Sequence, residues 1–313
     1  MTLKSDVTYC LNALKGFGQS RHQALRTGTA GETIFAVRTL QHYCRLGVTF
    51  AEWCRDRYGV KRLSQVTPAM TADFIVALRG RGLSPATVNT YVCAIKKLDA
   101  GLRKVGWRRP DAEPLVGEFH GRRADVVADP YSPEDAERLI GVLSRIDPQY
   151  GGVARLQRVS GLRVSEAVHV QAHCIEPDGH WIRLAGPGTH AKGGRPRTVP
   201  ILAQHQTVVA TFQEQGLAHT DGHVFQQRQS LTAAVKREAS RQAVKLGIEV
   251  GDGTHSFRKL YANELYQHLL REQQLERDDA RRVVTQALGH NRLEVLKAYL
   301  VEEPERKEND AVA

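Results

Sequence analysis

The apolar residues in the first third of the chain recur at intervals of three and four, the spacing of helices that each bury one face. One such run begins near Glu32 and is expected to end at Gly47, and its apolar positions are Ile34, Val37, Leu40 and Tyr43. A second helix, which contains Trp53, is expected over residues 50–58. The pattern predicts that residues 1–108 are helical throughout.

Two further helices in this region carry start signals. In each, a hydroxyl side chain that can cap the helix precedes a proline of the first turn, Thr67 before Pro68 and Ser84 before Pro85. The buried face of the second helix is predicted to consist of Val88, Tyr91, Val92, Ile95, Leu98 and Leu102. The cations that remain outside this face are Lys96, Lys97, Arg103 and Lys104.

The helical pattern stops at residues 109–130, which show no periodicity and contain three prolines, as a linker does. It resumes at Ser132, where a capping serine, a proline and two acidic residues mark a strong helix start. A following helix is expected to end at Gly161. The pattern therefore predicts two domains, residues 1–108 and 131–313, joined by this linker.

The second domain contains one place where the apolar period changes to two. After a short helix near Ser165, the strand-like runs Trp181–Leu184 and 197–201 flank a turn-rich segment. We predict a β-hairpin with Lys192 near its tip. Helices dominate the remainder, so the expected fold is mainly α with a small β-hairpin, an α+β class.

Two stretches near the C-terminus place polar groups beside an apolar face. The first is a helix that Thr254 is expected to cap, and its buried side chains are Phe257, Tyr261, Leu265 and Leu269. His255 and Arg258 lie one turn apart at the edge of this face.

The second stretch, residues 281–300, is expected to contain a helix that ends at Gly289 and another that Asn291 caps. Tyr299 lies at the edge of the apolar stripe formed there by Leu293, Leu296 and Leu300. A tyrosine at this edge can bury its ring while its hydroxyl faces a cleft, as a protein nucleophile requires. The alternative interpretation is a tyrosine of the core.

Charge is distributed unevenly along the chain, which has 44 Lys and Arg, 34 Asp and Glu and a sequence pI near 9.5. Residues 1–110 carry 18 basic and 6 acidic side chains, a net charge of +12, whereas residues 111–313 carry 26 and 28, a net charge of −2. A basic half indicates contact with a polyanion, and nucleic acid is favoured. The candidate contacts are Lys96, Lys97, Arg103 and Lys104, for which a solvated helix face is the alternative.

The composition also narrows the class of protein. The 5 cysteines are odd in number, scattered and without a CxxC pair, which is typical of free thiols in a reducing compartment. The sequence has no signal-like apolar run and no apolar segment of about 18 residues that could span a membrane. With 313 residues the chain can bury two cores without disulfides. We expect a soluble cytoplasmic protein.

Three familiar kinds of site do not fit the sequence. The segment GPGTHAKG resembles a phosphate-binding Walker loop, but Ala191 replaces its second glycine and Gly193 replaces the Ser or Thr after the lysine. There is no GxSxG elbow for a hydrolase serine. The residues that could bind zinc are His169, His173, Cys174 and His180. Their spacing matches neither a paired CxxC site nor an HExxH motif. We therefore expect neither a metal nor a cofactor.

Four segments of the second domain together resemble the catalytic boxes of the tyrosine recombinases, the phage integrase family. In chain order they are SGLRVSEAV (160–168), HAKGGRPRTVPI (190–201), HSFRKLYA (255–262) and LGHNRLEVLKAY (288–299). Four boxes in the same order and at similar spacing are far more specific than one. The resemblance implies a catalytic domain in residues 131–313. It also implies a helical core-binding (SAM-like) DNA-binding domain in residues 1–108, where the likeness is one of architecture.

The resemblance implies transfer of a DNA phosphodiester through Tyr299. This residue would attack the scissile phosphate to give a 3′-phosphotyrosine and a free 5′-hydroxyl. Arg163 and Arg258 would bind the nonbridging oxygens, and His290 would add a further hydrogen bond. Lys192 would protonate the leaving 5′-oxygen.

Two further residues have supporting roles by the same resemblance. His255 is similar to the family's general base or orienting histidine. Glu166, one turn after Arg163, would hold the arginine or a neighbouring histidine in place and is more structural than catalytic.

The resemblance also implies partners. These are double-stranded DNA with paired inverted half-sites, further copies of the chain in a tetramer on two duplexes, and accessory DNA-bending or directionality proteins at the nucleoid. The expected role is integration, excision or cointegrate resolution of a mobile element. Two alternatives stay open: a DNA-relaxing topoisomerase with the same active site, and a DNA-binding accessory protein without turnover.

Overall fold

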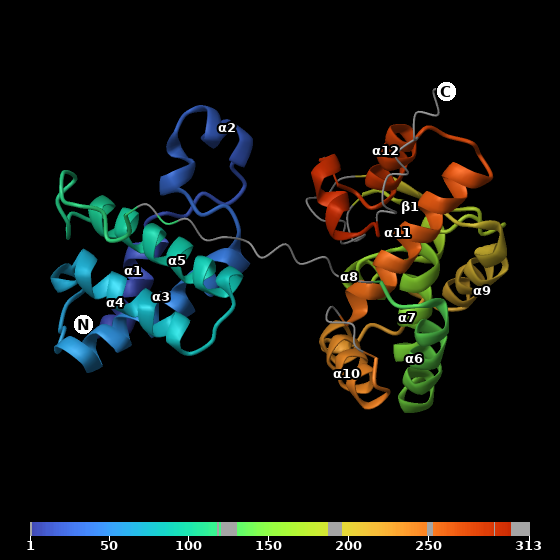
Figure 1. Ribbon diagram of the computed structural model, residues 1–313, viewed down its shortest axis with the longest axis horizontal. Coiled ribbons are helices and arrows are strands. Elements are labelled where there is room, and N and C mark those ends of the chain that lie inside the picture. Colours follow the sequence, from blue (N-terminus) through green and yellow to red (C-terminus); the bar gives the residue numbers. More distant parts are fainter. Residues whose placement is uncertain are drawn as a thin grey trace, which may run out of the picture. The chain divides into compact units, whose positions relative to one another are not determined.

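The computed structural model divides into two compact units, residues 1–125 and 126–313. Each unit is built mainly of helices (Figure 1). Each also has a hydrophobic core of its own. The expected fold class, mainly α with one small hairpin, is confirmed. The structure describes residues 2–117, 119, 130–186, 196–248, 253–290 and 292–301.

The first unit is built of helices, of which α1, α3 and α5 pack against one another. Its α-helices are α1 (Leu3–Asn12), α2 (Arg21–Arg26), α3 (Val37–Tyr58), α4 (Pro68–Gly80) and α5 (Pro85–Lys104). Two 3₁₀ helices lie between them, η1 (Thr29–Glu32) and η2 (Leu63–Gln65).

The start signals of α4 and α5 are confirmed. The hydroxyl of Thr67 accepts the N–H of Met70 at 3.3 Å, and that of Ser84 accepts the N–H of Thr87 at 3.2 Å. The predicted face of α5 is buried, with Tyr91 half-buried beside it. These helices begin where their caps predict because a side-chain cap satisfies an N–H that the first turn leaves without a partner.

The prediction that Gly47 ends a helix is wrong. Helix α3 runs through this position without a break and ends at Tyr58, directly before Gly59, which has a φ of +68°. A Cβ atom on Gly47 would lie 2.9 Å from Cγ1 of Val7 in α1. The glycine therefore lets two helices approach closely, and its helical conformation is ordinary. Val37, expected in the buried face, begins α3 and is 53% exposed.

The first unit extends past residue 108 into the segment expected to be a linker. Leu115 and Val116 are buried in its core. The carboxylate of Asp99, in α5, pairs with Arg103 at 3.2 Å and with Arg108 at 3.0 Å, and it accepts the N–H of Leu115 at 3.4 Å. This buried carboxylate fixes the chain that leaves α5.

The second unit contains seven α-helices and a two-stranded sheet among its described residues. The α-helices are α6 (Pro133–Ile146), α7 (Pro148–Ser160), α8 (Val164–Val168), α9 (Gln206–Leu217), α10 (Leu231–Lys245), α11 (Thr254–Arg271) and α12 (Arg277–Ala287). The strands are β1 (Trp181–Leu184) and β2 (Arg197–Pro200). The 3₁₀ helices are η3 (Ala172–Cys174), η5 (Ala203–His205) and η6 (Leu293–Ala298).

The predicted hairpin is confirmed at both strands. β1 and β2 pair antiparallel, with Trp181 opposite Pro200 and Leu184 opposite Arg197. Because side chains alternate along a strand, Leu184 is buried while Trp181 remains 41% exposed. The expected tip with Lys192 lies outside the described residues.

Helix α11 contacts α7, α10 and α12 (Figure 1). The predicted apolar face of this helix is buried. Its cap, however, lies one residue earlier than expected, at Gly253, and Thr254 is the first helical residue. The chain enters α11 with a φ of +53° at Gly253, a conformation that glycine adopts without steric cost.

All 5 cysteines are unpaired. Burial raises the pKa of the Cys10 and Cys54 thiols to about 12, so both are protonated and unreactive at neutral pH. Within the described ranges, no helix is long and apolar enough to cross a membrane.

Candidate active site

Five of the six candidate catalytic residues belong to elements that meet around the end of α12. Arg163 is the N-cap of α8, whereas His255 and Arg258 lie on the first turns of α11. His290 follows α12, and Tyr299 follows η6. The sixth candidate, Lys192, is outside the described residues.

Tyr299 lies among these polar side chains although its residue is only 5% exposed. Its hydroxyl is 3.2 Å from Nε2 of His290. The ring centroid of His255 is 5.2 Å from that of Tyr299, and the guanidinium carbon of Arg258 is 5.7 Å from it. The ring is thus packed inside the unit while its hydroxyl meets a hydrogen-bonding group, the combination that a protein nucleophile needs.

The helix expected to carry Tyr299 is a 3₁₀ helix, η6, with Arg292 as its N-cap. The expected cap, Asn291, is outside the described residues. Leu296 and Leu300 are buried as predicted, but Leu293 is 40% exposed, so the expected stripe is wrong at that position. A 3₁₀ helix has three residues per turn, and an apolar pattern counted at 3.6 residues per turn does not hold along it.

Arg258 is fully buried, which corrects its expected place at the edge of an apolar face. Its two terminal nitrogens donate to the main-chain oxygens of Gly161 and Leu288. Burial, together with the nearby charge of Arg163, lowers the pKa of Arg258 to about 10, so it remains a cation at neutral pH. Both acceptors lie at helix ends, where the helix dipole is negative.

The end of α12 explains why Leu288 can accept these bonds. Gly289, with a φ of +64°, donates to the oxygen of Gln286 at 2.8 Å, and the N–H of His290 donates to Thr285 at 2.9 Å. This pair of bonds is a Schellman ending. It turns the chain sharply, leaves the Leu288 oxygen to accept from Arg258 and from Arg163 at 3.4 Å, and places His290 beside Tyr299.

Glu166 forms ion pairs with two arginines, Arg163 and Arg197. Its carboxylate is fully buried and accepts from Arg163 at 2.9 Å and from Arg197 at 2.6 and 3.0 Å. Burial alone would raise the pKa of Glu166, but the hydrogen bonds and charge of Arg197, together with the charge of Arg163, outweigh it and lower the pKa to about 2. The group is therefore ionised at every physiological pH.

Arg197 was missed by the sequence analysis. Its side chain is 7% exposed, binds both oxygens of Glu166 and donates to the main-chain oxygen of Ala287 at 3.0 Å. It therefore ties the start of β2 to α8 and to the end of α12. The signal available in the sequence was its position five residues after Lys192, at the beginning of the second strand.

The four candidate DNA contacts of the first unit differ in what their cations bind. The ammonium of Lys97 donates to the oxygens of Ala30, Gly31 and Thr33 at 2.7 to 2.9 Å. Burial, reinforced by the charge of Arg21, lowers the pKa of Lys97. This lysine holds η1 against α5, and its ammonium group is engaged in hydrogen bonds within the unit.

Arg103 is engaged in a similar way, because it binds Asp99 and the main-chain oxygens of Arg109, Pro110 and Ala112. Lys96 and Lys104 are exposed. The last two therefore remain the candidate phosphate contacts of α5.

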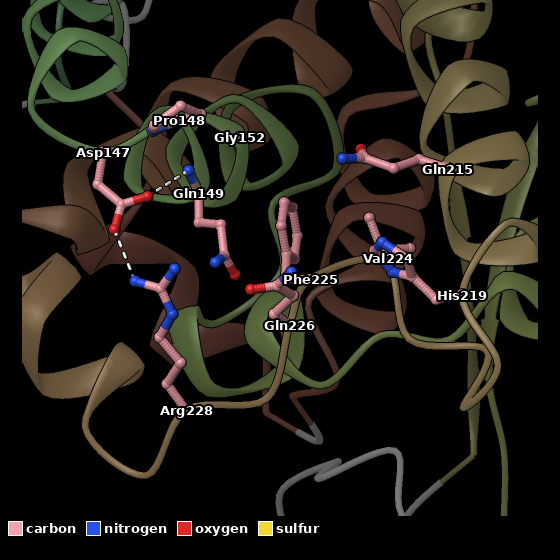
Figure 2. A pocket seen from close by; sticks show the side chains of 10 residues that line it. All are labelled: Asp147, Pro148, Gln149, Gly152, Gln215, His219, Val224, Phe225, Gln226 and Arg228. Carbon is pink, nitrogen blue, oxygen red and sulfur yellow. Dashed lines mark hydrogen bonds and ion pairs between the residues drawn. The ribbon is translucent and has the colours of Figure 1, made fainter.

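A separate cavity of about 360 Å³ lies between the start of α7 and the loop before α10 (Figure 2). The carboxylate of Asp147 accepts the N–H of Gln149 and binds Arg228, both at 2.9 Å, on one side of it. The ring of Phe225 packs against Gly152, where a Cβ would lie 2.7 Å from the ring. None of the candidate catalytic residues lines this cavity.

The residues considered as zinc ligands do not assemble into a site in the described part of the chain. No group of three or more His, Cys, Asp or Glu side chains there has the arrangement of a metal site. Cys174 is buried, with the ring of His173 3.5 Å from its sulfur.

The model of the phage integrase family matches residues 132–306, more than half of the chain. The chain belongs to the phage integrase family. The matched range includes the four boxes and all six candidate catalytic residues.

Curated family members are similar over most of the chain. The tyrosine recombinase XerC of Neisseria meningitidis serogroup B (strain ATCC BAA-335 / MC58) is 26% identical over 278 residues, which cover 80% of this chain and 84% of the relative. XerC of Xanthomonas campestris pv. campestris (strain B100) is 23% identical over 84% of this chain and 78% of the relative. This phage integrase family member is a site-specific DNA recombinase of the tyrosine type.

Solved structures of the family have the same fold. The XerH site-specific recombinase in a post-cleavage complex with palindromic difH substrate superposes with a TM-score of 0.62 at 16% identity, over 97% of this chain and 92% of that one. A lambda integrase dimer bound to a COC′ core site gives a TM-score of 0.62 at 15% identity, over 100% and 99%.

Proposed function

We propose that this recombinase cuts DNA with Tyr299 and stores the broken bond as a 3′-phosphotyrosine. The observation that carries the proposal is the 3.2 Å contact between the Tyr299 hydroxyl and His290, beside two buried or half-buried arginines. The tyrosine oxygen attacks the scissile phosphorus as the bond to the 5′-oxygen breaks. A 5′-hydroxyl of the partner duplex then attacks the phosphotyrosine and releases the tyrosine, so each phosphodiester broken is replaced by another.

The arginines supply the positive charge that the transition state requires. Negative charge gathers on the nonbridging oxygens of the five-coordinate phosphorus, and Arg163 and Arg258 meet it with planar, multiply donating guanidinium groups. The carbonyl contacts of Arg258 orient its guanidinium before DNA arrives. His290 donates one further hydrogen bond. Glu166 and Arg197 position Arg163 and the end of α12.

Lys192 and His255 complete the proposed proton transfers. Lys192, expected near the hairpin tip, protonates the leaving 5′-oxygen. His255, whose ring packs edge-on against Tyr299 at 5.2 Å, orients the tyrosine or takes its proton. The Tyr299 proton has to leave as the new bond forms, because the oxygen of a phosphotyrosine ester is bonded to carbon and phosphorus and carries no hydrogen.

The proposed substrate is double-stranded DNA with paired inverted half-sites, which the chain binds as a tetramer on two duplexes. The first unit, residues 1–125, contacts the phosphate backbone through its surplus of positive charge. The biological role is integration, excision or cointegrate resolution of a mobile element at the nucleoid, with accessory DNA-bending or directionality proteins. The recombinase names of the curated relatives favour DNA recombination over topoisomerase activity or a silent accessory protein.

A nicked suicide duplex tests the chemistry. The duplex carries a half-site that the protein binds, selected from the DNA that flanks its gene. After cleavage a short strand is lost from the nicked duplex, and this loss traps the covalent complex. The unmodified protein and Tyr266→Phe, a matched loss of a buried tyrosine hydroxyl on α11, should both be trapped. Tyr299→Phe should not. A covalent complex with Tyr299→Phe would refute the assignment, and relaxation of plasmids without the site would favour a topoisomerase.

A further inference from the structure

The side-chain amide of Asn263 forms hydrogen bonds with the main chain of Tyr299 and of Val301, the residues on either side of Leu300. Its Nδ2 donates to the main-chain oxygen of Tyr299 at 2.6 Å. Its Oδ1 accepts the N–H of Val301 at 2.9 Å. The two bonds close a ring around Leu300, so the amide fixes the local path of the chain at the end of η6.

The amide is itself held in one orientation. Nδ2 also donates to the oxygen of Lys259, one turn earlier on α11, at 2.8 Å. Each of the two Nδ2 hydrogens thus has a carbonyl acceptor, and the opposite end of the amide meets a donor. Among side chains of this size only asparagine offers two donors and an acceptor in this arrangement. A leucine of similar shape offers neither, and an aspartate would turn a carboxylate towards two carbonyl oxygens.

The position of Asn263 gives these bonds a further consequence. It lies on α11, the helix that also carries His255 and Arg258. The amide therefore connects the backbone of the proposed nucleophile directly to the helix that holds two of the groups it must face. A displacement of about 1 Å in such a geometry lowers a reaction rate by roughly 100-fold.

We propose that Asn263 is a positioning residue that holds Tyr299 in register with Arg258 and His255 for attack on the DNA phosphate. It acts through the main chain of Tyr299 and does not touch the substrate. The inference rests on the proposed function of Tyr299 as the nucleophile, and it adds a residue that none of the four sequence boxes contains.

The test uses Asn263→Leu in the full chain, with Asn263→Ser as a second variant if the first does not fold. Two quantities are measured: the single-turnover rate of covalent complex formation on saturating suicide duplex, and the hydrogen exchange of the Val301 amide in the DNA-free protein. Leu269→Ala, a buried truncation near the far end of α11, is the control for lost stability alone.

We expect Asn263→Leu to cleave about 100-fold more slowly than the unmodified protein, by the cost of a misplaced nucleophile, while its DNA affinity stays within about twofold. The Val301 amide should exchange faster because its acceptor is gone. Leu269→Ala should keep the cleavage rate of the folded protein and the Val301 exchange rate. A cleavage rate for Asn263→Leu within about threefold of the unmodified protein, or unchanged exchange at Val301, would overturn the proposal.

The two proposals fail in different ways. If Tyr299→Phe still becomes linked to DNA, the proposed nucleophile is wrong and a positioning role for Asn263 falls with it, whatever the exchange at Val301. If Tyr299→Phe is inert but Asn263→Leu cleaves normally, the nucleophile stands and only the positioning role is overturned.

Discussion

The side chain of Arg258 donates a hydrogen bond to the main-chain oxygen of Leu288, 30 residues further along the chain. The same oxygen accepts from Arg163 at 3.4 Å. One carbonyl at the end of α12 therefore orients both candidate phosphate-binding arginines. The turn at Gly289 that exposes this carbonyl also directs His290 towards Tyr299, so a single helix ending organises most of the site.

Replacement of Gly289 by alanine is expected to lower both stability and cleavage. A side chain at a left-handed position costs about 1–2 kcal/mol. The added Cβ would also lie 3.0 Å from Cδ of Arg197, tighter than an ordinary contact. To relieve that contact, either the Leu288 carbonyl or Arg197 has to move. Arg163 and Arg258, which bind the Leu288 carbonyl, would be displaced as well. Urea unfolding and the single-turnover rate on suicide duplex measure the two effects.

Gly247→Ala is the matched control for that variant. Gly247 ends α10 in the same Schellman geometry, with a φ of +70°, and a Cβ there would meet nothing within 4 Å. It should lose a similar amount, about 1–2 kcal/mol, from the left-handed conformation and keep its cleavage rate. Equal cleavage by the two alanine variants would contradict the role of the α12 ending.

Glu166 is predicted to make the stability of the second unit depend on acid pH. Its folded pKa of about 2 lies below the ordinary value of 4.5, so ionised Glu166 favours the folded state above pH 4.5. This contribution, on the order of 3 kcal/mol, is lost as the pH falls from 4.5 towards 2. Urea unfolding at a series of pH values should show the loss in the unmodified protein.

In Glu166→Gln that part of the pH dependence should be absent. At neutral pH the variant should be less stable by about 3–5 kcal/mol, because Arg197 is left buried without its counter-charge. Glu137→Gln removes a surface ion pair with Arg155, whose side chains are 52% and 42% exposed, and should change stability by no more than about 0.5 kcal/mol. A pH profile of Glu166→Gln identical to that of the unmodified protein would exclude this contribution.

The sequence was sufficient for features that depend on a few adjacent residues. Thr67, Ser84 and Ser132 cap their helices as predicted, and the hairpin strands differ from the structure by one residue at one end. Gly47 shows the limit of such local signals. The sequence does not distinguish a glycine that ends a helix from a glycine that lets a neighbouring helix approach. At Gly47 the distinction depends on Val7, which lies close to it in the folded chain.

The site was predictable as a set of residues, through the resemblance of four boxes, but its connections were not. Arg197 binds Glu166 across 31 residues and Ala287 across 90. No periodicity encodes those contacts, because they depend on how β2, α8 and α12 pack together. The complete burial of Arg258 was missed for the same reason, since its two carbonyl acceptors come from other helices.

The lysines of α5 are predicted to separate into structural and DNA-binding groups. Lys97→Met should lower the stability of the first unit by roughly 1–3 kcal/mol, because three main-chain oxygens lose a charged donor. Lys96→Gln and Lys104→Gln should leave stability unchanged. Each should instead reduce the slope of log binding constant against log salt by about 0.9, as expected for one lost phosphate contact.

Binding measured over a series of salt concentrations, together with urea unfolding, distinguishes these lysine variants. The prediction fails if Lys97→Met keeps full stability, or if the salt slopes of Lys96→Gln and Lys104→Gln equal that of the unmodified protein.

His290→Phe should slow cleavage without a large loss of stability. Phenylalanine keeps a ring beside Tyr299 but removes the nitrogen that lies 3.2 Å from the tyrosine hydroxyl. Loss of one preorganised donor to a transition state typically costs about 100- to 1,000-fold in rate. The single-turnover rate on suicide duplex should fall by that factor, with DNA affinity within about threefold.

His173→Phe, a change at an exposed histidine away from Tyr299, should cleave normally. Cleavage by His290→Phe at the rate of His173→Phe would remove His290 from the catalytic set and leave the 3.2 Å contact as packing alone.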